Sequence, residues 1–494
     1  MAGGVFSKAS RPKRPGAYFN WLAVQPADVA PAIGSVVAVG FTHTWGPLEQ
    51  AVALTSLGEF LSVYGGDPND PSEGYKAVKQ AFQGEGVGGA GGAGTVIAYR
   101  MGDNGAAKAA KTIQNTAGSP ANAITLTARY EGTDGNNLRV TTQNNAANSA
   151  NNDLLIYDGT TLLESYTYAD TNITALVDAI NGTSAWVTAT MLVTGTALAT
   201  VSAQAFTGGD DGVDLVAGDY TSAMDALETE RFGIVVFADL IDEDILASAV
   251  SWIQDVNANG KRCFLVCGGD TDESVADAIT RSVSIDDENV VNIGGGHVSD
   301  ANLLDSSGDP VVLSTAQLAP RIAGVLAHRG ERTSMTFAHL SGLTLYNAAT
   351  AAEILRAFDG GVIVLSRDSN LVSPVRIEKS LTTYTTTTDS DKPYKVFRDP
   401  KAVATMHGIQ MELTEWGEAN VVGQPVDSET RAAVLGKIGE IMDRRVNDRI
   451  IQSGWTAKID PVPPPSDDDD FVAFEITAKY GRSAEQVYFT GRLG

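Results

Sequence analysis

The chain repeats an order of apolar strand and amphipathic helix in two separate stretches, residues 33–100 and 216–371. Short runs of consecutive apolar residues are typical of strands buried on both faces, and apolar residues three and four positions apart are typical of helices. In the helix predicted over 242–256, for example, Ile245, Ala249 and Trp252 fall on one face. This alternation predicts a parallel sheet covered by helices. The predicted strands are 35–41, 95–100, 233–238, 262–267, 290–293 and 362–365, and the predicted helices lie near 56–64, 75–82, 220–230, 242–256, 272–281 and 348–358.

The stretch from 101 to 215 differs in character, because it is rich in Thr, Asn, Ala and Gly and contains several strand-like runs. Asp158-Gly159 is a hairpin signal between two of these runs. We therefore expect a β-rich insertion that interrupts the α/β core. The predicted strands are AITLTARY, LRVTTQ, DLLIYDGTTLLESYTY and SAWVTATMLV, and a short helix is predicted from the spacing of Ile173, Leu176, Val177 and Ile180.

The part after residue 371 begins with the strand-like run VRIEKSLTTYTTTT and contains a long helix predicted from Ser428 to about Gln452. A Pro-rich hinge, PVPPPSDDDD, separates that helix from two terminal strands. Period-two alternation predicts these strands, with apolar positions at Val472, Phe474, Ile476, Val487 and Phe489. The helix carries an apolar stripe of Leu435, Ile438, Met442, Val446 and Ile450.

The first 28 residues are predicted to form an extended arm rather than a domain. Several prolines break any helix, and residues 17–24 alternate in a pattern that suits a strand. No partner strand adjoins this segment in sequence. The arm also contains four basic residues and no acidic residue before Asp28.

These patterns predict a multidomain α/β and α+β protein. Its expected parts are a discontinuous α/β core with a parallel-type sheet, a β-rich inserted domain, and a C-terminal α+β docking domain with extended strand arms at both chain ends. The expected boundaries are 1–28 for the N-terminal arm, 29–100 and 216–371 for the core, 101–215 for the insertion, 372–470 for the C-terminal domain and 471–494 for the C-terminal strands.

Charge and composition narrow the function classes. The 494 residues include 43% hydrophobic and 19% charged residues, so the chain has enough apolar side chains to fold. Its net charge of −25 argues against a nucleic-acid partner, because most of its surface would repel phosphates. No apolar run is long enough for a membrane helix, and the start lacks the apolar segment of a secretory signal.

The only two cysteines, Cys263 and Cys267, lie in one predicted strand. Their Cα atoms would be roughly 13 Å apart in a strand, beyond the ~7 Å limit for a disulfide. We expect free, buried thiols, a usage that fits assembly in a reducing cytoplasm.

Motifs for enzyme chemistry are weak or missing. Gly84, Gly86 and Gly89 match GxGxxG but follow a predicted helix and precede a strand, the reverse of the order in a dinucleotide site. The five histidines form no metal-ligand pair, and Asp467 to Asp470 read as a solvated linker rather than a cation site. Asp286, Asp287 and Glu288 could hold an acid/base pair, but no nucleophile or base accompanies them. We expect no catalytic residue, no metal and no cofactor.

A basic cluster of Arg444, Arg445 and Arg449 lies on the predicted long helix. Such a cluster is either a solvated helix face or a contact with a partner, and the sequence alone does not choose between them.

Several motifs together resemble the contractile phage tail sheath family, over nearly the whole chain. The resemblance begins with RPGAYFNW and SVVAVGFTHTWGPLEQAVALTSLGEFLSVYGG. It continues through YKAVKQAFQGEG, TVIAYR, ARYEGTDGNNLRV, FTGGDDG and VRIEKSLTTYT, and it ends with ANVVGQPVDSETRAAVLGKIGEIMDRR.

The resemblance implies a structural protein, not an enzyme. It implies subunits that form stacked hexameric rings around a tail tube and contract to drive the tube through the target cell envelope. The implied partners are neighbouring sheath subunits, the tube protein, and baseplate and terminator proteins, with assembly in the host bacterial cytoplasm into a virion tail. The inserted domain would face outward, and Arg444, Arg445 and Arg449 are candidate tube contacts.

The resemblance also gives the predicted terminal strands a purpose, because sheath subunits exchange strands by β-augmentation. The candidate intersubunit residues are Pro15, Gly16, Tyr18, Phe19, Trp21, Val472, Phe474, Ile476, Val487 and Phe489.

Two alternatives stay open at this point. The sheath could belong to a phage-derived bacteriocin or another contractile injection system rather than to a phage. A surface-layer type structural protein is a further alternative, although such a protein needs an export signal.

Overall fold

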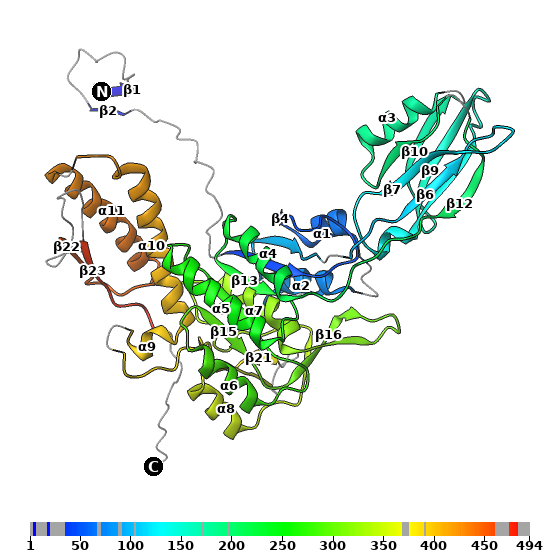
Figure 1. The fold of residues 1–494 in the computed structure, drawn as a ribbon. Coiled ribbons are helices and arrows are strands. Elements are labelled where there is room, and N and C mark those ends of the chain that lie inside the picture. Colours follow the sequence, from blue (N-terminus) through cyan, green and yellow to red (C-terminus); the bar gives the residue numbers. More distant parts are fainter. Residues whose placement is uncertain are drawn as a thin grey trace.

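The fold is described from a computed structural model of the 494-residue chain (Figure 1). The description covers residues 3–5, 17–19, 35–66, 71–86, 91–102, 105–169, 172–194, 197–367, 375–389, 392–425, 427–459 and 474–482. The expected hinge at 461–470 lies outside these residues.

A seven-stranded sheet forms the centre of the molecule. Six of its strands are parallel, as predicted, and the seventh, β4, runs antiparallel at one edge beside β5. Most of these strands are buried along their whole length, which explains their continuous apolar runs. In spatial order the strands are β19 (Val362–Ile363), β15 (Val290–Ile293), β14 (Phe264–Cys267), β13 (Ile234–Phe237), β3 (Val36–Phe41), β5 (Thr95–Arg100) and β4 (Ala51–Leu54).

Helices cover both faces of this sheet. Alternate residues of β3 take part in different apolar clusters, one shared with α1, α2 and α7 and the other with α4 and α5. Helices α6 and α8 pack together near β19. The six strands and six helices predicted for the core are confirmed, with ends shifted by a few residues. The helices are α1 (Leu57–Tyr64), α2 (Glu73–Gln83), α4 (Ala217–Glu228), α5 (Glu243–Ala258), α6 (Val275–Ile285), α7 (Thr315–Arg329) and α8 (Ala351–Asp359).

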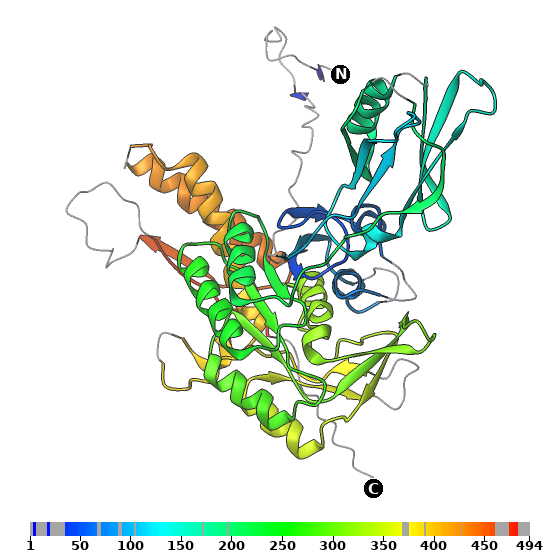
Figure 2. The same cartoon turned by 45° about the vertical axis from the view of Figure 1, so that its right-hand side comes forward.

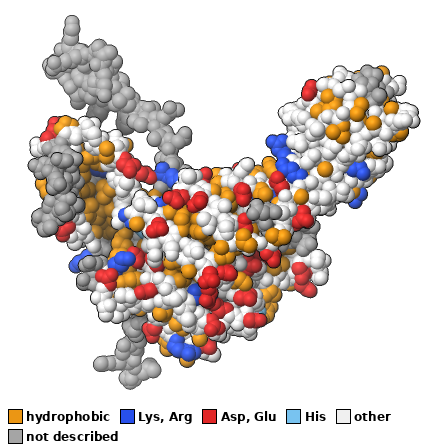
Figure 3. Space-filling model, viewed as in Figure 1, with side chains coloured by type: hydrophobic (Ala, Val, Ile, Leu, Met, Phe, Trp, Pro, Cys, Tyr) orange, Lys and Arg blue, Asp and Glu red, His pale blue; other side chains and the backbone are white. Residues whose placement is uncertain are grey.

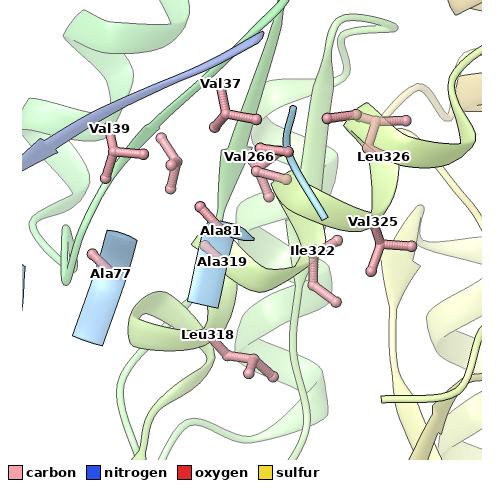
Figure 4. Packing of buried hydrophobic residues seen from close by; sticks show 14 of the residues in the cluster. Val37, Val39, Ala77, Ala81, Val266, Leu318, Ala319, Ile322, Val325 and Leu326 are labelled. Carbon is pink, nitrogen blue, oxygen red and sulfur yellow. The ribbon is translucent and has the colours of Figure 1, made fainter. Parts of the chain in front are cut away.

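Helix α7 was not predicted, although it contributes more buried residues than any other helix of the core. Its apolar side chains pack on the sheet and against α2, which lies beside it; Figure 4 shows Ala319 of α7 next to Ala81 of α2. A Cβ atom at Gly324 would lie 2.2 Å from the carbonyl oxygen of Ala81 on α2, so the two helices touch through their backbones. A helix buried nearly all round has no polar face, and the amphipathic pattern used for prediction is therefore missing.

A buried polar network joins α2, α7 and the neighbouring strand β16 (His297–Leu304). The Arg321 guanidinium on α7 is fully buried and donates to Gln83 Oε1 at 2.8 Å and to the Ser341 carbonyl at 2.7 Å. It also lies 3.9 Å from Asp300, which accepts a hydrogen bond from Gln80 Nε2. Burial lowers the pKa of Arg321 to about 10. Each charge is thus compensated by partners on different elements, as buried ions require.

The insertion is a sandwich of two antiparallel sheets with α3 (Ile173–Thr183) packed on strands of both (Figures 1 and 2). The predicted hairpin is present at Gly159, which has a positive φ, and the predicted helix is α3. One sheet contains β10 (Thr161–Ala169), β9 (Asn151–Asp158), β8 (Leu138–Asn144) and β12 (Val201–Ala205), and the other contains β11 (Val187–Met191), β7 (Asn122–Ala128) and β6 (Ala110–Gln114); a 3-10 helix, η2 (Thr133–Asn137), precedes β8.

Two small sheets complete the central body. A three-stranded sheet with strand order β17-β16-β18 lies between the sequences of β15 and α8, where no strands were predicted. Of the strand-like run at 375–388 only β21 is a strand, because the Thr-rich remainder instead hydrogen-bonds to neighbouring loops. These strands are β16 (His297–Leu304), β17 (Pro310–Leu313), β18 (Leu343–Tyr346), β20 (Leu365–Arg367) and β21 (Val375–Ile377).

The C-terminal unit consists mainly of two antiparallel helices and a two-stranded sheet, and its helices project away from the central body (Figure 2). The predicted long helix is present as α11 but ends five residues early. Helix α10 was not predicted. The elements are α9 (Tyr394–Phe397), α10 (Pro400–Asn420), α11 (Ser428–Asn447), β22 (Thr456–Ile459) and β23 (Phe474–Thr477).

The expectation that the terminal strands lack local partners is wrong for the strands at 17–19 and 474–477, and the predicted strand at 487–489 lies outside the described residues. In the N-terminal arm, β2 (Ala17–Phe19) pairs in parallel with β1 (Gly3–Val5). Near the other end, β23 pairs antiparallel with β22. Each partner is separated from its strand by more than ten residues, a distance that hairpin signals do not cover.

Among the described residues, every helix is too short or too polar to cross a lipid bilayer.

Patches of acidic side chains lie on the face of the central body in Figure 3. The central body also contains a half-buried aspartate, Asp239. Asp239 follows β13 with a φ of 57°. Burial, together with the charges of Glu73 and Asp270, raises the pKa of Asp239 to about 6. At neutral pH its ionised form therefore costs folding free energy.

We expect Asp239→Asn to raise the free energy of unfolding at pH 7 by about 1 kcal/mol, after allowing for partial solvent exposure. Because the pKa is higher in the folded chain, the wild type loses stability as pH rises from about 4 to about 6. Asparagine tolerates a positive φ and does not ionise. Urea denaturation at pH 7 and pH 4 measures the effect, which should vanish at pH 4. Asp225→Asn, on the exposed face of α4, is the matched control, and equal shifts in both variants would contradict the prediction.

Candidate assembly surfaces

Few of the predicted arm residues lie in the described part of the chain. Tyr18 and Phe19 belong to β2, and Phe474 and Ile476 belong to β23. The remaining predicted arm residues lie outside the described residues: Pro15, Gly16, Trp21, Val472, Val487 and Phe489.

The sheet formed by β22 and β23 has two outer edges without a partner strand among the described residues. Phe474 and Ile476 are half-buried and pack with Ala457 of β22 against the apolar stripe of α11. Glu475 and Thr477 alternate with them and are exposed. The predicted alternation is therefore confirmed for this strand. Unpaired strand edges of this kind can accept an additional strand.

Helix α11 supplies the apolar face on which this sheet rests. Its N-terminus is capped by Asp427, which accepts hydrogen bonds from the backbone of Glu429 and Thr430. Ile438 and Met442 of the predicted stripe are buried against the sheet and α10. The Trp455 indole donates to Asp443 at 2.9 Å and holds the entry to β22 against the helix.

A buried ionic junction fixes these helices to the central body. Arg445 is only 1% exposed; its Nε lies 3.0 Å from Glu331, just after α7, and its Nη2 lies 2.9 Å from Glu412 on α10. Burial raises the pKa of Glu331, with Arg445 acting in the opposite direction. Burial also acts to raise the pKa of Glu412, but hydrogen bonds and charge from Arg445 and Arg444 hold it below its ordinary value. The Arg445 guanidinium thus links α11 to α10 and to the end of α7.

Helix α10 reaches the junction because its backbone approaches closely. A Cβ atom at Gly408 would lie 2.8 Å from Arg445 Nη2 and 2.9 Å from Glu331 Oε2, so a larger residue would disturb the junction. The adjacent His407 packs on Phe264 of β14, with ring centroids 5.0 Å apart. Burial, and then the charge of Arg262, lowers the pKa of His407 to about 3, so this ring is neutral at physiological pH.

The structure separates the three arginines of the predicted basic cluster. Arg445 lies inside the protein and serves the junction between domains. Arg444 is about half-exposed and shares Glu412 with Arg445, and Arg449 is exposed just beyond α11 with a φ of 61°. Only Arg444 and Arg449 therefore present charge at the surface.

The three acidic residues at 286–288 bind the chain segment that leads to the C-terminal unit. Asp286 accepts hydrogen bonds from Thr385 and Thr386, and Glu288 forms an ion pair with Lys392 at 2.8 Å. Burial acts to raise the pKa of Asp286, but these threonine hydrogen bonds hold it below its ordinary value. The carboxylates of Asp286 and Glu288 are therefore engaged in structural contacts with this segment.

The glycine motif, the aspartate run and the two cysteines are the remaining candidates for chemistry. Gly84 and Gly86 follow α2 rather than precede a helix, and Gly89 lies outside the described residues, as do Asp467 to Asp470. Cys263 and Cys267 are free and buried, as predicted, and burial raises their pKa to about 12 and about 11. Within the described ranges no group of three potential metal ligands occurs.

Two features of this region escaped the sequence analysis. Helix α10 begins at Asp399-Pro400, a capping residue followed by proline at the first helical position, and that signal could have located it. The burial of Arg445 has no comparable signal, because its acidic partners lie 33 and 114 residues away in sequence.

Comparisons with known proteins agree with this architecture. Residues 103–211 match the family model for the phage tail sheath protein beta-sandwich domain, and residues 215–383 match the model for the phage tail sheath protein central domain. The uncharacterized protein YqbK of Bacillus subtilis (strain 168) is 23% identical, covering 84% of this chain and 82% of its own. A putative tail sheath protein of Enterococcus phage phiEF24C is 24% identical over 50% of this chain and 41% of its own.

Solved structures share the fold. The sheath tail protein from Desulfitobacterium hafniense superposes with a TM-score of 0.67 at 18% identity, covering 94% of this chain and 100% of its own. The helical sheath protein of the anti-feeding prophage in its contracted state gives a TM-score of 0.53 at 12% identity, over 98% and 100%. The two family models together cover more than half of the chain. The chain therefore belongs to the contractile phage tail sheath family, whose members are structural proteins of phage or phage-like contractile tails and not enzymes.

Proposed function

We propose that the chain is a sheath subunit that polymerises into stacked hexameric rings around a tail tube and contracts to drive that tube through the target cell envelope. Its partners would be neighbouring copies, the tube protein, and baseplate and tail terminator proteins. Assembly would take place in the host bacterial cytoplasm, and the product would be part of a virion tail. The sheath of a bacteriocin or another phage-like injection system would use the same surfaces.

The observation that carries this proposal is the sheet of β22 and β23, whose outer edges have no partner strand in the described ranges. A neighbouring copy could add an extended segment to either edge through main-chain hydrogen bonds. The strand-forming ends of the chain are the segments we propose, with Tyr18, Phe19 and Trp21 on the N-terminal arm and Val487 and Phe489 at the C-terminus.

Energetics explain why such contacts need a lattice. About six ladder hydrogen bonds contribute a net ~0.5–1.5 kcal/mol each, and ordering the arm costs ~1–2 kcal/mol per residue. A single arm therefore binds weakly. When one subunit engages several neighbours, the effective concentration of each further strand rises and assembly becomes cooperative.

The rigid attachment of the C-terminal unit supports a contraction in which subunits turn as whole bodies. Arg445 joins α11 to α10 and to the end of α7, and the segment at 385–392 is bound to the loop at 286–288. Flexibility would then lie in the exchanged arms rather than between these units. The anti-feeding prophage protein, which shares this fold, has been observed as a contracted helical sheath.

For the tube contact we propose Arg444 and Arg449, which are the surface members of the predicted cluster. Their positive charge stands out on a chain of net charge −25. An acidic tube surface would be attracted to them at low ionic strength. Arg445, the third residue of the original cluster, is assigned to the domain junction instead.

Removing residues 1–24 should give a folded monomer that no longer polymerises, because the augmenting strand is lost while the described domains keep their contacts. Negative-stain electron microscopy measures tube formation, and light scattering with circular dichroism reports mass and fold. Tyr18→Pro in the full-length chain is the companion variant, since proline removes a ladder donor without shortening the arm. Normal sheath-like tubes from the truncated chain would refute the arm proposal.

Reversing the charge of Arg444 and Arg449 to Glu should reduce sheath assembly on purified tubes at low salt by about tenfold or more, through loss of electrostatic attraction. Co-sedimentation with tubes at two salt concentrations measures this effect. Arg431→Glu is the matched control on the same helix, about 140° from Arg444 around the axis. Assembly that survives the double reversal at low salt would exclude these two residues as tube contacts.

A further inference from the structure

The junction between the inserted sandwich and the central body is unusually well packed for a domain boundary. The sandwich is inserted through two chain connections, near 101–107 and 206–215, and both are rich in glycine. Connections of that composition are typical of a flexible tether that lets a domain reorient. The junction nevertheless contains buried side-chain contacts and close backbone contacts between the two domains.

A tryptophan of the central body is part of the core of the sandwich. Trp45 lies in the loop after β3, yet it is 5% exposed and belongs to the apolar cluster of the sandwich. Its ring stacks on Trp186 with centroids 5.7 Å apart, and it meets Tyr130 edge-on at 5.4 Å. Any tilt of the sandwich would withdraw this side chain from its pocket and expose it to water.

Polar contacts surround the tryptophan. Arg100, the last residue of β5, is 1% exposed and donates to the carbonyl of Gly46 at 3.0 Å and to that of Glu131 at 2.9 Å. Thr44 Oγ1 donates to Asp134 Oδ2 at 2.7 Å. The returning chain is held as well, because Thr133 donates to Asp211 through both its amide, at 2.8 Å, and its hydroxyl.

Glycines bring the backbones of the two domains into direct contact. A Cβ atom at Gly132, which has a φ of +127°, would lie 1.9 Å from the carbonyl oxygen of Thr44. Two further close contacts lie on either side of this one: within the insertion, a Cβ atom at Gly209 would lie 2.4 Å from the carbonyl of Gly132, and within the central body, a Cβ atom at Gly46 would lie 2.3 Å from the Tyr64 ring. The segments around Thr44, Gly132 and Gly209 therefore lie in close contact at the base of the sandwich.

From this geometry we propose that Trp45 is a positioning residue that locks the sandwich to the central body, so that the two move as a single rigid unit. The lock has a recognisable construction: an aromatic side chain of one domain inserted into the core of the other, with a ring of hydrogen bonds and backbone contacts around it. This inference concerns the isolated chain and does not depend on the proposed function.

Pulsed electron spin resonance on the full-length chain tests the lock. Spin labels at Ser149→Cys, in the turn between β8 and β9, and at Ser251→Cys, on the exposed side of α5, report the distance between the domains. Both native thiols are buried, so labelling would be selective. We expect a single narrow distance distribution, and Trp45→Ala should broaden it by about twofold or more, since the domains then behave as loosely linked units.

Trp252→Ala is the matched control, because it removes a partly buried tryptophan from the central body away from the junction. It should leave the distribution narrow. Hydrogen exchange at β8 and β9 should stay slow in both variants, which shows that the sandwich is still folded. An unchanged distribution in Trp45→Ala, or equal broadening in both variants, would overturn the proposal.

If Trp45→Ala fails to fold, the double variant Asp134→Ala, Asp211→Ala removes the contacts made by Thr44 and Thr133 and leaves the Arg100 contacts and the apolar core in place. It should broaden the distribution to a smaller extent, and Trp45→Phe should do the same. Distributions as narrow as in the wild type for both of these variants would likewise overturn the proposal.

Discussion

The burial of α7 is the constraint on which the rest of the structure depends. This helix packs on the parallel sheet beside α2, and its backbone touches α2 at Gly324. Arg321, at its middle, neutralises Asp300 and so connects the small β16 sheet to the core. Glu331, two residues after its end, meets Arg445 of the C-terminal unit. Three parts of the protein thus take their positions from one buried segment.

Sequence patterns predicted the helices that bury one face and the strands that are buried on both faces. Helix α5 shows a clear apolar stripe, and β3 and β13 show continuous apolar runs, so all three were predictable. Helix α7 was not, because it is buried all round and contains Pro320. The partner of Arg445 was also hidden, since ion pairs between distant segments leave no local pattern. The same holds for the pairing of β23 with β22, which spans a long connection.

The charge of the protein is distributed unevenly between its inside and its surface. Arg100, Arg281, Arg321 and Arg445 are all buried, where they bind carbonyls or carboxylates. With these basic groups inside, the exposed surface is richer in acid than the formal count of −25 suggests (Figure 3). Neighbouring copies would therefore repel each other at long range, and specific contacts must overcome that repulsion. Attachment through strand edges suits this situation, because main-chain hydrogen bonds carry no net charge.

The close backbone contacts at the base of the sandwich also bear on how the protein could be modified. Gly132 leaves no room for a side chain against Thr44 of the central body, so a peptide inserted near it would separate the two domains. The turn at 145–150 lies at an exposed end of the sandwich and has no such neighbours. If the sandwich is held rigidly as proposed, a peptide inserted in this turn would keep a defined orientation relative to the central body. In a helical array it would be displayed at regular spacing, which makes this turn the natural site for attaching cargo or an imaging label.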